Sequence, residues 1–135
     1  MTLRSPFARL ALSAVAAGAL VLSAAGVASA HASLVSANIE PGQVFPRNAY
    51  PRTLIGRFAE NVRPGGSFIH VFEGDSKGDH GMVDTGANLF PLKRPKEIVA
   101  TLPRNLGKGL YTVIWFTTSV DDGHKAGNSF SFTVK

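Results

Sequence analysis

The chain has 135 residues, with 14 Lys and Arg against nine Asp and Glu, and it contains no cysteine. The absence of cysteine excludes disulfides, thiolate catalysis and zinc sites built on thiolates. The basic residues are scattered along the sequence, without a basic stripe or an RNA-binding aromatic motif, so we do not expect the protein to bind nucleic acid.

Residues 1–30 have the composition of a secretory signal peptide. Arg4 and Arg9 supply the positively charged start, and an apolar run follows over residues 10–27. Ala28-Ser29-Ala30 is then a cleavage site of the small-x-small type. An uncleaved membrane anchor is the alternative, because the 18 residues of the run are at the lower limit for spanning a bilayer. The weak hydrophobicity of its Ala and Gly residues and the presence of the cleavage site favour removal.

Cleavage after Ala30 defines one mature domain, residues 31–135, which is long enough to form a hydrophobic core. We expect this domain to be exported, either to a periplasm or to the outside of the cell. Cleavage also makes His31 the N-terminal residue. Its free α-amine and its imidazole then form a pair of nitrogen donors that can chelate copper.

The mature part has the pattern of short strands separated by turns rich in Gly and Pro, and no amphipathic helix is expected in it. Turns are expected at residues 41–42, 63–66 and 107–109. The segments predicted as strands are residues 34–37, 53–58, 67–72, 88–92, 97–102, 110–118 and 128–134.

In the penultimate predicted strand, residues 110–118, side chains alternate most clearly between the two faces of the sheet. Tyr111, Val113 and Trp115 share one face, whereas Ile114 and Phe116 lie on the other, so we expect this strand to be covered on both sides. About seven strands with one central Trp predict an all-β fold, a seven-stranded immunoglobulin-like Greek-key β-sandwich. An eight-stranded barrel is the alternative.

Two of the four histidines are expected to have no functional role. His70 lies within a predicted strand, where a packed or surface histidine is the expected state. His80 lies in a loop rich in Gly and Asp, which is typical of a solvated turn. A weak second metal site formed by Asp79 and His80 is the alternative for this loop.

The late histidine, His124, lies in a polar loop, Asp122-Gly123-His124, between the last two predicted strands. In a sandwich this loop and the first strand can lie at the same end. His31 and the Asp-Gly-His loop could therefore meet and form one metal site.

Several short motifs of the mature part accompany the terminal histidine and the late loop. They are His31-Ala32-x-Leu34, Ser36 with Pro41, Phe58-Ala59-Glu60-x-Val62, Gly109-x-Tyr111-x-Val113-x-Trp115, Ser119 with Asp122-Gly123-His124, and Gly127-x-x-Phe130-x-Phe132-x-Val134. In these residues the mature chain resembles the CopC/PcoC family of exported copper-resistance proteins, and the resemblance covers most of residues 31–135.

The resemblance implies a seven-stranded sandwich that binds Cu(II) through the N-terminal amine and imidazole, a histidine of the late loop and a nearby aspartate. Carried over to this sequence, the metal ligands are His31, Asp122 and His124. Glu60 matches an acidic residue near that site, and it would contact the metal ligands without binding the metal itself. Nitrogen donors with one carboxylate oxygen suit Cu(II), and copper affinity should fall with acidity because all these donors must be deprotonated.

The sequence departs from the family pattern at two points. Family members usually have Ser-x-Asp-x-His, whereas one extra residue separates Ser119 from His124. Asp121 is therefore an alternative to Asp122 as the ligand, or a supporting carboxylate beside it. Some members bind Cu(I) through a Met-rich loop, but Met82 is the only Met after residue 30, and no Cu(I) site is expected.

These features predict an exported Cu(II) carrier or buffer in copper homeostasis or resistance, rather than an enzyme. We expect a monomer, with a membrane copper transporter as a candidate partner. Two alternatives remain. A terminal histidine with a second histidine also occurs in copper-dependent oxidases of the polysaccharide monooxygenase type, and a metal-free structural or adhesion sandwich would have the same strand pattern.

Overall fold

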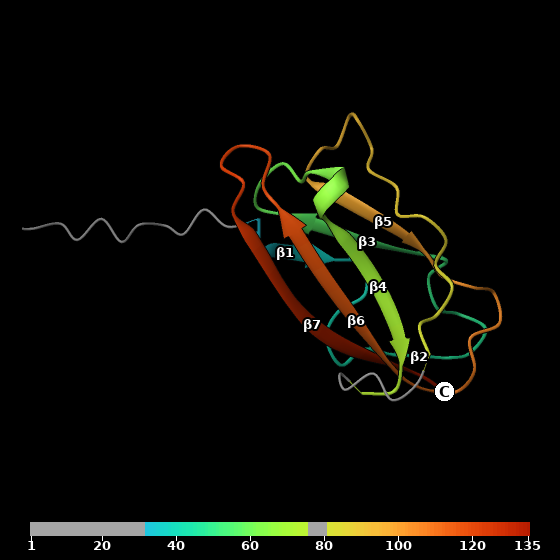
Figure 1. Ribbon diagram of the computed structural model, residues 1–135. Helices are drawn as coiled ribbons and strands as arrows, with labels where there is room; N and C mark the ends of the chain where they lie inside the picture. Colours follow the sequence, from blue (N-terminus) through green and yellow to red (C-terminus); the bar gives the residue numbers. More distant parts are fainter. Residues whose placement is uncertain (1–31, 76–80) are drawn as a thin grey trace, which may run out of the picture.

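The computed structural model describes residues 32–75 and 81–135. The predicted signal peptide, His31, Asp79 and His80 lie outside the described residues. The described chain forms β1 (Leu34–Ala37), β2 (Val44–Phe45), β3 (Thr53–Phe58), the 3₁₀ turn η1 (Pro64–Gly66), β4 (Phe68–Glu73), β5 (Glu97–Thr101), β6 (Gly109–Thr118) and β7 (Lys125–Val134) (Figure 1). Within these described ranges, no helix is both long and apolar enough to cross a membrane.

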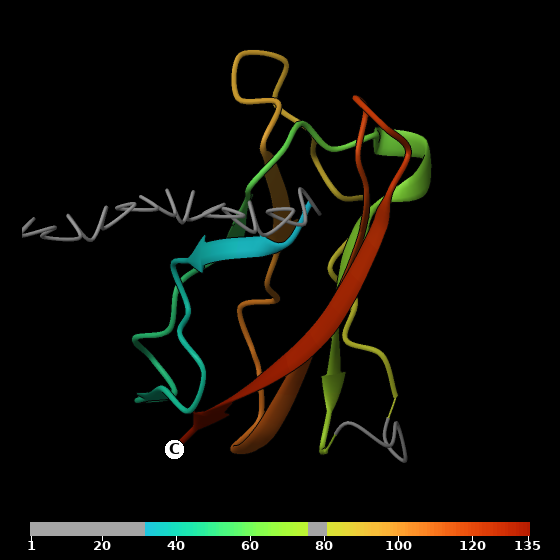
Figure 2. The same ribbon diagram turned by 90° about the vertical axis from the view of Figure 1, so that its left-hand side faces the viewer.

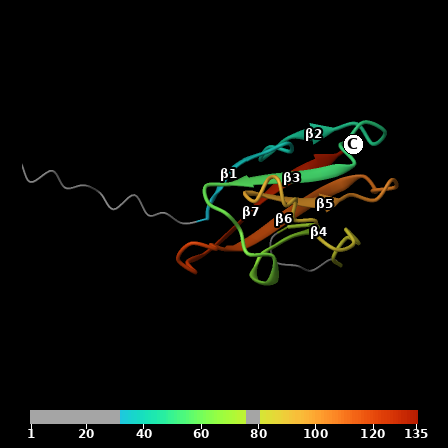
Figure 3. The same ribbon diagram turned by 90° about the horizontal axis from the view of Figure 1, so that it is seen from above.

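The strands form two sheets that face each other (Figure 2). One sheet has the order β1-β3-β5, and the other has the order β2-β7-β6-β4. Neighbouring strands are antiparallel except for the short β2, which is parallel to β7. This arrangement confirms the seven-stranded β-sandwich predicted from the sequence. The alternative of an eight-stranded barrel is wrong, because the strands form two separate sheets (Figure 3).

The predicted strands differ from the structure at two points. The segment at residues 88–92 is a loop that forms only one bridge, from Leu89 to Val99 of β5. Its Asn88 side chain instead accepts from the backbone N–H of Ile69 at 2.8 Å and donates to its carbonyl at 3.0 Å. A side-chain amide therefore satisfies the backbone groups of Ile69 at the edge of β4. Conversely, β2 was not predicted, because its two residues are too few to form a recognisable pattern.

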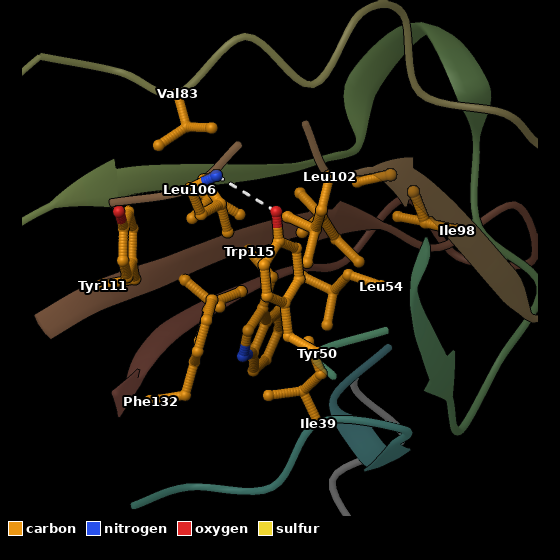
Figure 4. Close-up of a cluster of buried hydrophobic side chains, with 14 of the residues drawn as sticks. Ile39, Tyr50, Leu54, Val83, Ile98, Leu102, Leu106, Tyr111, Trp115 and Phe132 are labelled. Carbon is orange, nitrogen blue, oxygen red and sulfur yellow. Dashed lines mark hydrogen bonds between the residues drawn. The ribbon is translucent and has the colours of Figure 1, made fainter. Parts of the chain in front are cut away.

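The core lies between the sheets, and the predicted inward face of β6 is confirmed (Figure 4). Tyr111, Val113 and Trp115 are all buried. On the outer face, Phe116 is half-buried and stacks on Phe68 with a centroid separation of 5.8 Å. The outer face is thus covered by neighbouring side chains of the same sheet, and the strand is not enclosed by a further layer as we had expected.

Tyr50 fixes the loop that precedes β6. Its hydroxyl donates to the carbonyl oxygen of Pro103. The same hydroxyl accepts from the backbone N–H of Leu106 at 3.0 Å (Figure 4). Because both Tyr50 and Leu106 are buried, breaking these bonds would leave buried polar groups unpaired. The loop at residues 103–108 is therefore held against the segment before β3.

Candidate metal centre

The loop between β6 and β7 is a tight turn built around glycine. The β6–β7 ladder ends with the pair Thr118–Lys125, and the backbone N–H of Ser119 then donates to the carbonyl of His124 at 2.8 Å. Gly123 has a φ of 72°, in the left-handed region that residues with a Cβ rarely adopt. The glycine of the Asp-Gly-His motif thus allows the chain to turn between the two side chains predicted as metal ligands.

Asp122 and His124 form a compact pair within this turn. One carboxylate oxygen of Asp122 accepts from the backbone N–H of His124 at 2.9 Å, and the other lies 2.5 Å from Nδ1 of the His124 ring. Both side chains remain accessible, with 37% of Asp122 and 61% of His124 exposed. The structure therefore brings together two of the predicted site residues at the surface, where a metal ion can reach them.

The two groups shift each other's pKa in opposite directions. The hydrogen bonds from the ring and the backbone of His124 lower the pKa of Asp122 to about 2. The hydrogen bond to Asp122 and the charge of its carboxylate raise the pKa of His124 above 6.5, and the charge of Glu60 adds to the increase. The pair therefore holds its proton more tightly than a free imidazole does, and this proton would compete with a metal ion for the same atoms.

The segment after β3 lies beside this loop. Val62 forms a bridge with Ser119, and the backbone N–H of Val120 donates to the carbonyl of Asn61 at 2.9 Å. Glu60 is placed here, and its Oε2 is buried without a hydrogen-bond partner among the described residues. A buried carboxylate oxygen lacking a donor is unfavourable, so this atom is suited to accept from an N–H group or to face a cation.

The first described residue is anchored at the same end of the sandwich. The hydroxyl of Thr117, at the end of β6, donates to the carbonyl oxygen of Ala32 at 2.5 Å. The backbone N–H of Ala59 then donates to the carbonyl of Ser33 at 2.9 Å. Ala32 and Thr117 are fully buried. The start of the domain is therefore clamped between the two segments that carry Glu60 and the Asp-Gly-His loop.

The other candidate residues lie less centrally. Asp121 is exposed, and its backbone N–H donates to the hydroxyl of Ser119 at 3.2 Å. His70 lies on the outer face of β4, where its ring stacks on Phe68 with a centroid separation of 4.4 Å, in agreement with the structural role expected for it. Within the part of the chain that the structure describes, no group of three or more His, Asp or Glu side chains is placed to hold a metal ion.

Sequence reasoning missed Thr117. Its side chain links the end of β6 to the start of the domain. A single threonine in a β-strand forms no recognisable motif, and the carbonyl that it binds is 85 residues away in the sequence. A polar residue at an inward position of an otherwise apolar strand was the only available signal.

The fold and this end of the molecule define a two-sheet β-sandwich with a histidine–carboxylate pair beside the start of the domain. The model of the CopC domain family matches residues 34–135. CopC from Methylosinus trichosporium OB3b has a similar crystal structure, with a TM-score of 0.65 and 28% sequence identity, and the match covers 78% of this chain and 94% of that one.

The crystal structure of PcoC, a methionine-rich copper resistance protein from Escherichia coli, is also similar. The TM-score is 0.62 and the sequence identity 26%, over 78% of this chain and 100% of that one. No curated protein sequence gives a significant match. The chain belongs to the CopC domain family, which confirms the resemblance found in the sequence motifs.

We expect Asp122→Asn to lower the pKa of His124 toward 6.5, because the substitution weakens the hydrogen bond to the imidazolium and removes the negative charge beside it. An NMR titration of the His124 ring in the metal-free protein measures this shift. Asp121→Asn is the matched control, since it removes the same charge from the neighbouring position. Equal shifts in the two variants would contradict the specific pairing of Asp122 with His124.

Proposed function

We propose that this protein is an exported Cu(II) carrier or buffer in copper homeostasis or resistance. The observation that carries the proposal is that Ala32, Glu60 and the Asp122–His124 pair converge at one end of a CopC-domain sandwich. One relative of known structure is described as a copper resistance protein. The function proposed is binding and transfer of a metal ion rather than catalysis.

The metal ligands in this proposal are His31, Asp122 and His124. Cleavage after Ala30 gives His31 a free α-amine, and the peptide bond ties it to Ala32, whose carbonyl is fixed by Thr117. The two nitrogens of His31 can therefore reach the loop without ordering a long segment. Three nitrogens and one carboxylate oxygen form a set that suits Cu(II), the tightest binder among the divalent first-row ions.

The Asp122–His124 contact supports a direct role for both side chains. Nδ1 of His124 and Oδ2 of Asp122 lie 2.5 Å apart and face each other across a single proton. Copper would replace this proton and take both atoms as donors, so binding should release a proton. Asp121 is the neighbouring carboxylate, and its negative charge would attract the copper ion without coordinating it.

Glu60 has a supporting role in this proposal. Its Oε2 is buried and has no partner among the described residues, although it lies in the segment that flanks the loop. A metal-bound amine or imidazole keeps N–H groups that need acceptors, and such outer acceptors fix the orientation of metal ligands. We therefore assign to Glu60 the acceptor position for an N–H of His31.

The ligand set also selects the oxidation state. The chain has no cysteine, and Met82 is the only methionine after residue 30, in contrast to the methionine-rich relative from Escherichia coli. Cu(I) prefers such soft sulfur ligands, so reduction should weaken binding and allow release. A monomer that gives up its copper in this way would fit a membrane copper transporter as its acceptor.

Addition of one Gly before His31 should lower the Cu(II) affinity of the exported protein by at least 10–100-fold, roughly the loss caused by removing an outer partner of a ligand. The added residue keeps the imidazole but turns the amine into an amide, which is a poor donor near neutral pH. Titration of both forms against a competing chelator at one pH measures the loss. Unchanged affinity in the extended form would rule out the amine as a ligand.

We also expect Thr117→Val to weaken copper binding by about tenfold or more, because it removes the hydrogen bond that holds Ala32 beside the loop. Thr118→Val is the matched control, since the hydroxyl of Thr118 donates to the carbonyl of Gly66 at 2.8 Å and does not touch the start of the domain. Each variant should lose about 1–3 kcal/mol of unfolding free energy, measured with urea. Equal copper affinities in the two variants would show that anchoring of Ala32 does not position the site.

A further inference from the structure

The end of the sandwich opposite the Asp-Gly-His loop carries a concentrated positive charge. Basic residues that are scattered in the sequence line one open hollow of about 590 Å³, and no Asp or Glu of the described ranges 32–75 and 81–135 lines it. All five of these side chains are exposed. They form the basic end, which consists of Arg47, Arg52, Arg104, Lys108 and Lys135.

Hydrogen bonds between distant segments hold these residues together. The hydroxyl of Tyr50 binds the loop that carries Arg104 and Lys108, through Pro103 and Leu106. The backbone N–H of Arg47 donates to the carbonyl of Lys135 at 2.7 Å. The positive charges are therefore attached to a fixed backbone frame, so little backbone ordering is needed when the basic end meets a partner.

The side chain of Arg52 is also held in place. Its guanidinium lies 4.8 Å from the centre of the Tyr50 ring and donates to the carbonyl of Pro103 at 3.4 Å. Five positive charges line this hollow, and its lining includes no acidic side chain of the described residues. Such an arrangement is repulsive by itself and is stabilised by an external anion.

Two exposed apolar side chains lie next to the basic end. Val44 of β2 and Leu110 of β6 both pair with Thr133 of β7, so the three side chains point to the same outer side of the sheet. Val44 is 50% exposed and Leu110 is 43% exposed. Positive charge beside exposed apolar groups is the combination with which peripheral proteins contact a lipid interface.

We propose that the basic end docks on an anionic phospholipid surface. The phosphodiester headgroups would neutralise the five cations, and Val44 and Leu110 would contact the upper part of the bilayer. An open surface with exposed, separate cations fits a plane of many headgroups better than one small anion. The Asp-Gly-His loop lies at the other end of the ten-residue strand β6, about 30 Å away, so docking leaves it facing outward (Figure 1).

The test is co-sedimentation of the exported protein with vesicles made of phosphatidylglycerol and phosphatidylcholine in equal parts. The protein should bind these vesicles, should not bind vesicles of phosphatidylcholine alone, and should dissociate as salt is added. Arg104→Gln combined with Lys108→Gln should weaken binding by roughly 25-fold, or about fivefold for each cation removed. Arg47→Gln combined with Lys135→Gln, from other segments, should have a similar effect.

Lys93→Gln combined with Lys96→Gln is the matched control. It changes the net charge equally, but Lys96 lies at the other end, where its carbonyl accepts from the backbone N–H of Phe58. This control should bind vesicles as the unmodified protein does. Equal losses in control and test pairs would overturn the proposal, because net charge alone would then explain binding.

Two further results would also overturn the proposal. One is equal binding to vesicles with and without phosphatidylglycerol. The other is binding of polyglutamate, but not of vesicles, with the same dependence on Arg104 and Lys108, since the basic end would then recognise an acidic polypeptide. Copper affinity should be unchanged in the variants of the basic end, so the outcome is independent of the proposed metal site.

Discussion

A buried hydrogen bond from Thr117 to the carbonyl of Ala32 connects the two parts of the chain on which the proposed metal centre depends. Without it, a buried carbonyl and a buried hydroxyl would lose their partner, at a cost of about 1–3 kcal/mol each. The bond fixes the start of the domain against the end of β6, and the turn that follows β6 carries Asp122 and His124. A β-sandwich core thus positions a surface site through one polar contact in its interior.

The second constraint is the competition between protons and copper that the proposed metal site implies at His124. Because Asp122 holds the imidazolium form, the pKa of His124 is raised, and the proton is lost only as pH rises through that higher value. The pKa of Asp122 is about 2, so its carboxylate is ionised throughout this range. Copper binding should therefore weaken as pH falls through the pKa of His124, while the charge of Asp122 still attracts the ion. An exported carrier with this pair would release copper more readily in acidic surroundings.

Local patterns in the sequence predicted much of the fold. Alternation placed Tyr111, Val113 and Trp115 in the core, because strand periodicity is a local property. The two-residue β2 and the edge-capping Asn88 depend on partners far away in the chain, and no local pattern encodes them.

The candidate site shows the same difference between features that a local pattern encodes and features that depend on distant residues. Asp122 and His124 were predictable because two residues of one turn must lie together, and Glu60 was found only through the family resemblance. Thr117 was missed because its partner is distant, and the role of His31 stays a prediction.

The central claim is that processing creates the metal site by placing a free amine on His31. The most direct measurement is the intact mass of the exported protein under native conditions, with and without Cu(II). The account predicts a mass that begins at His31 and increases by a single copper ion when Cu(II) is added. A mature protein that begins at another residue and still binds copper, or one that begins at His31 and binds none, would contradict it.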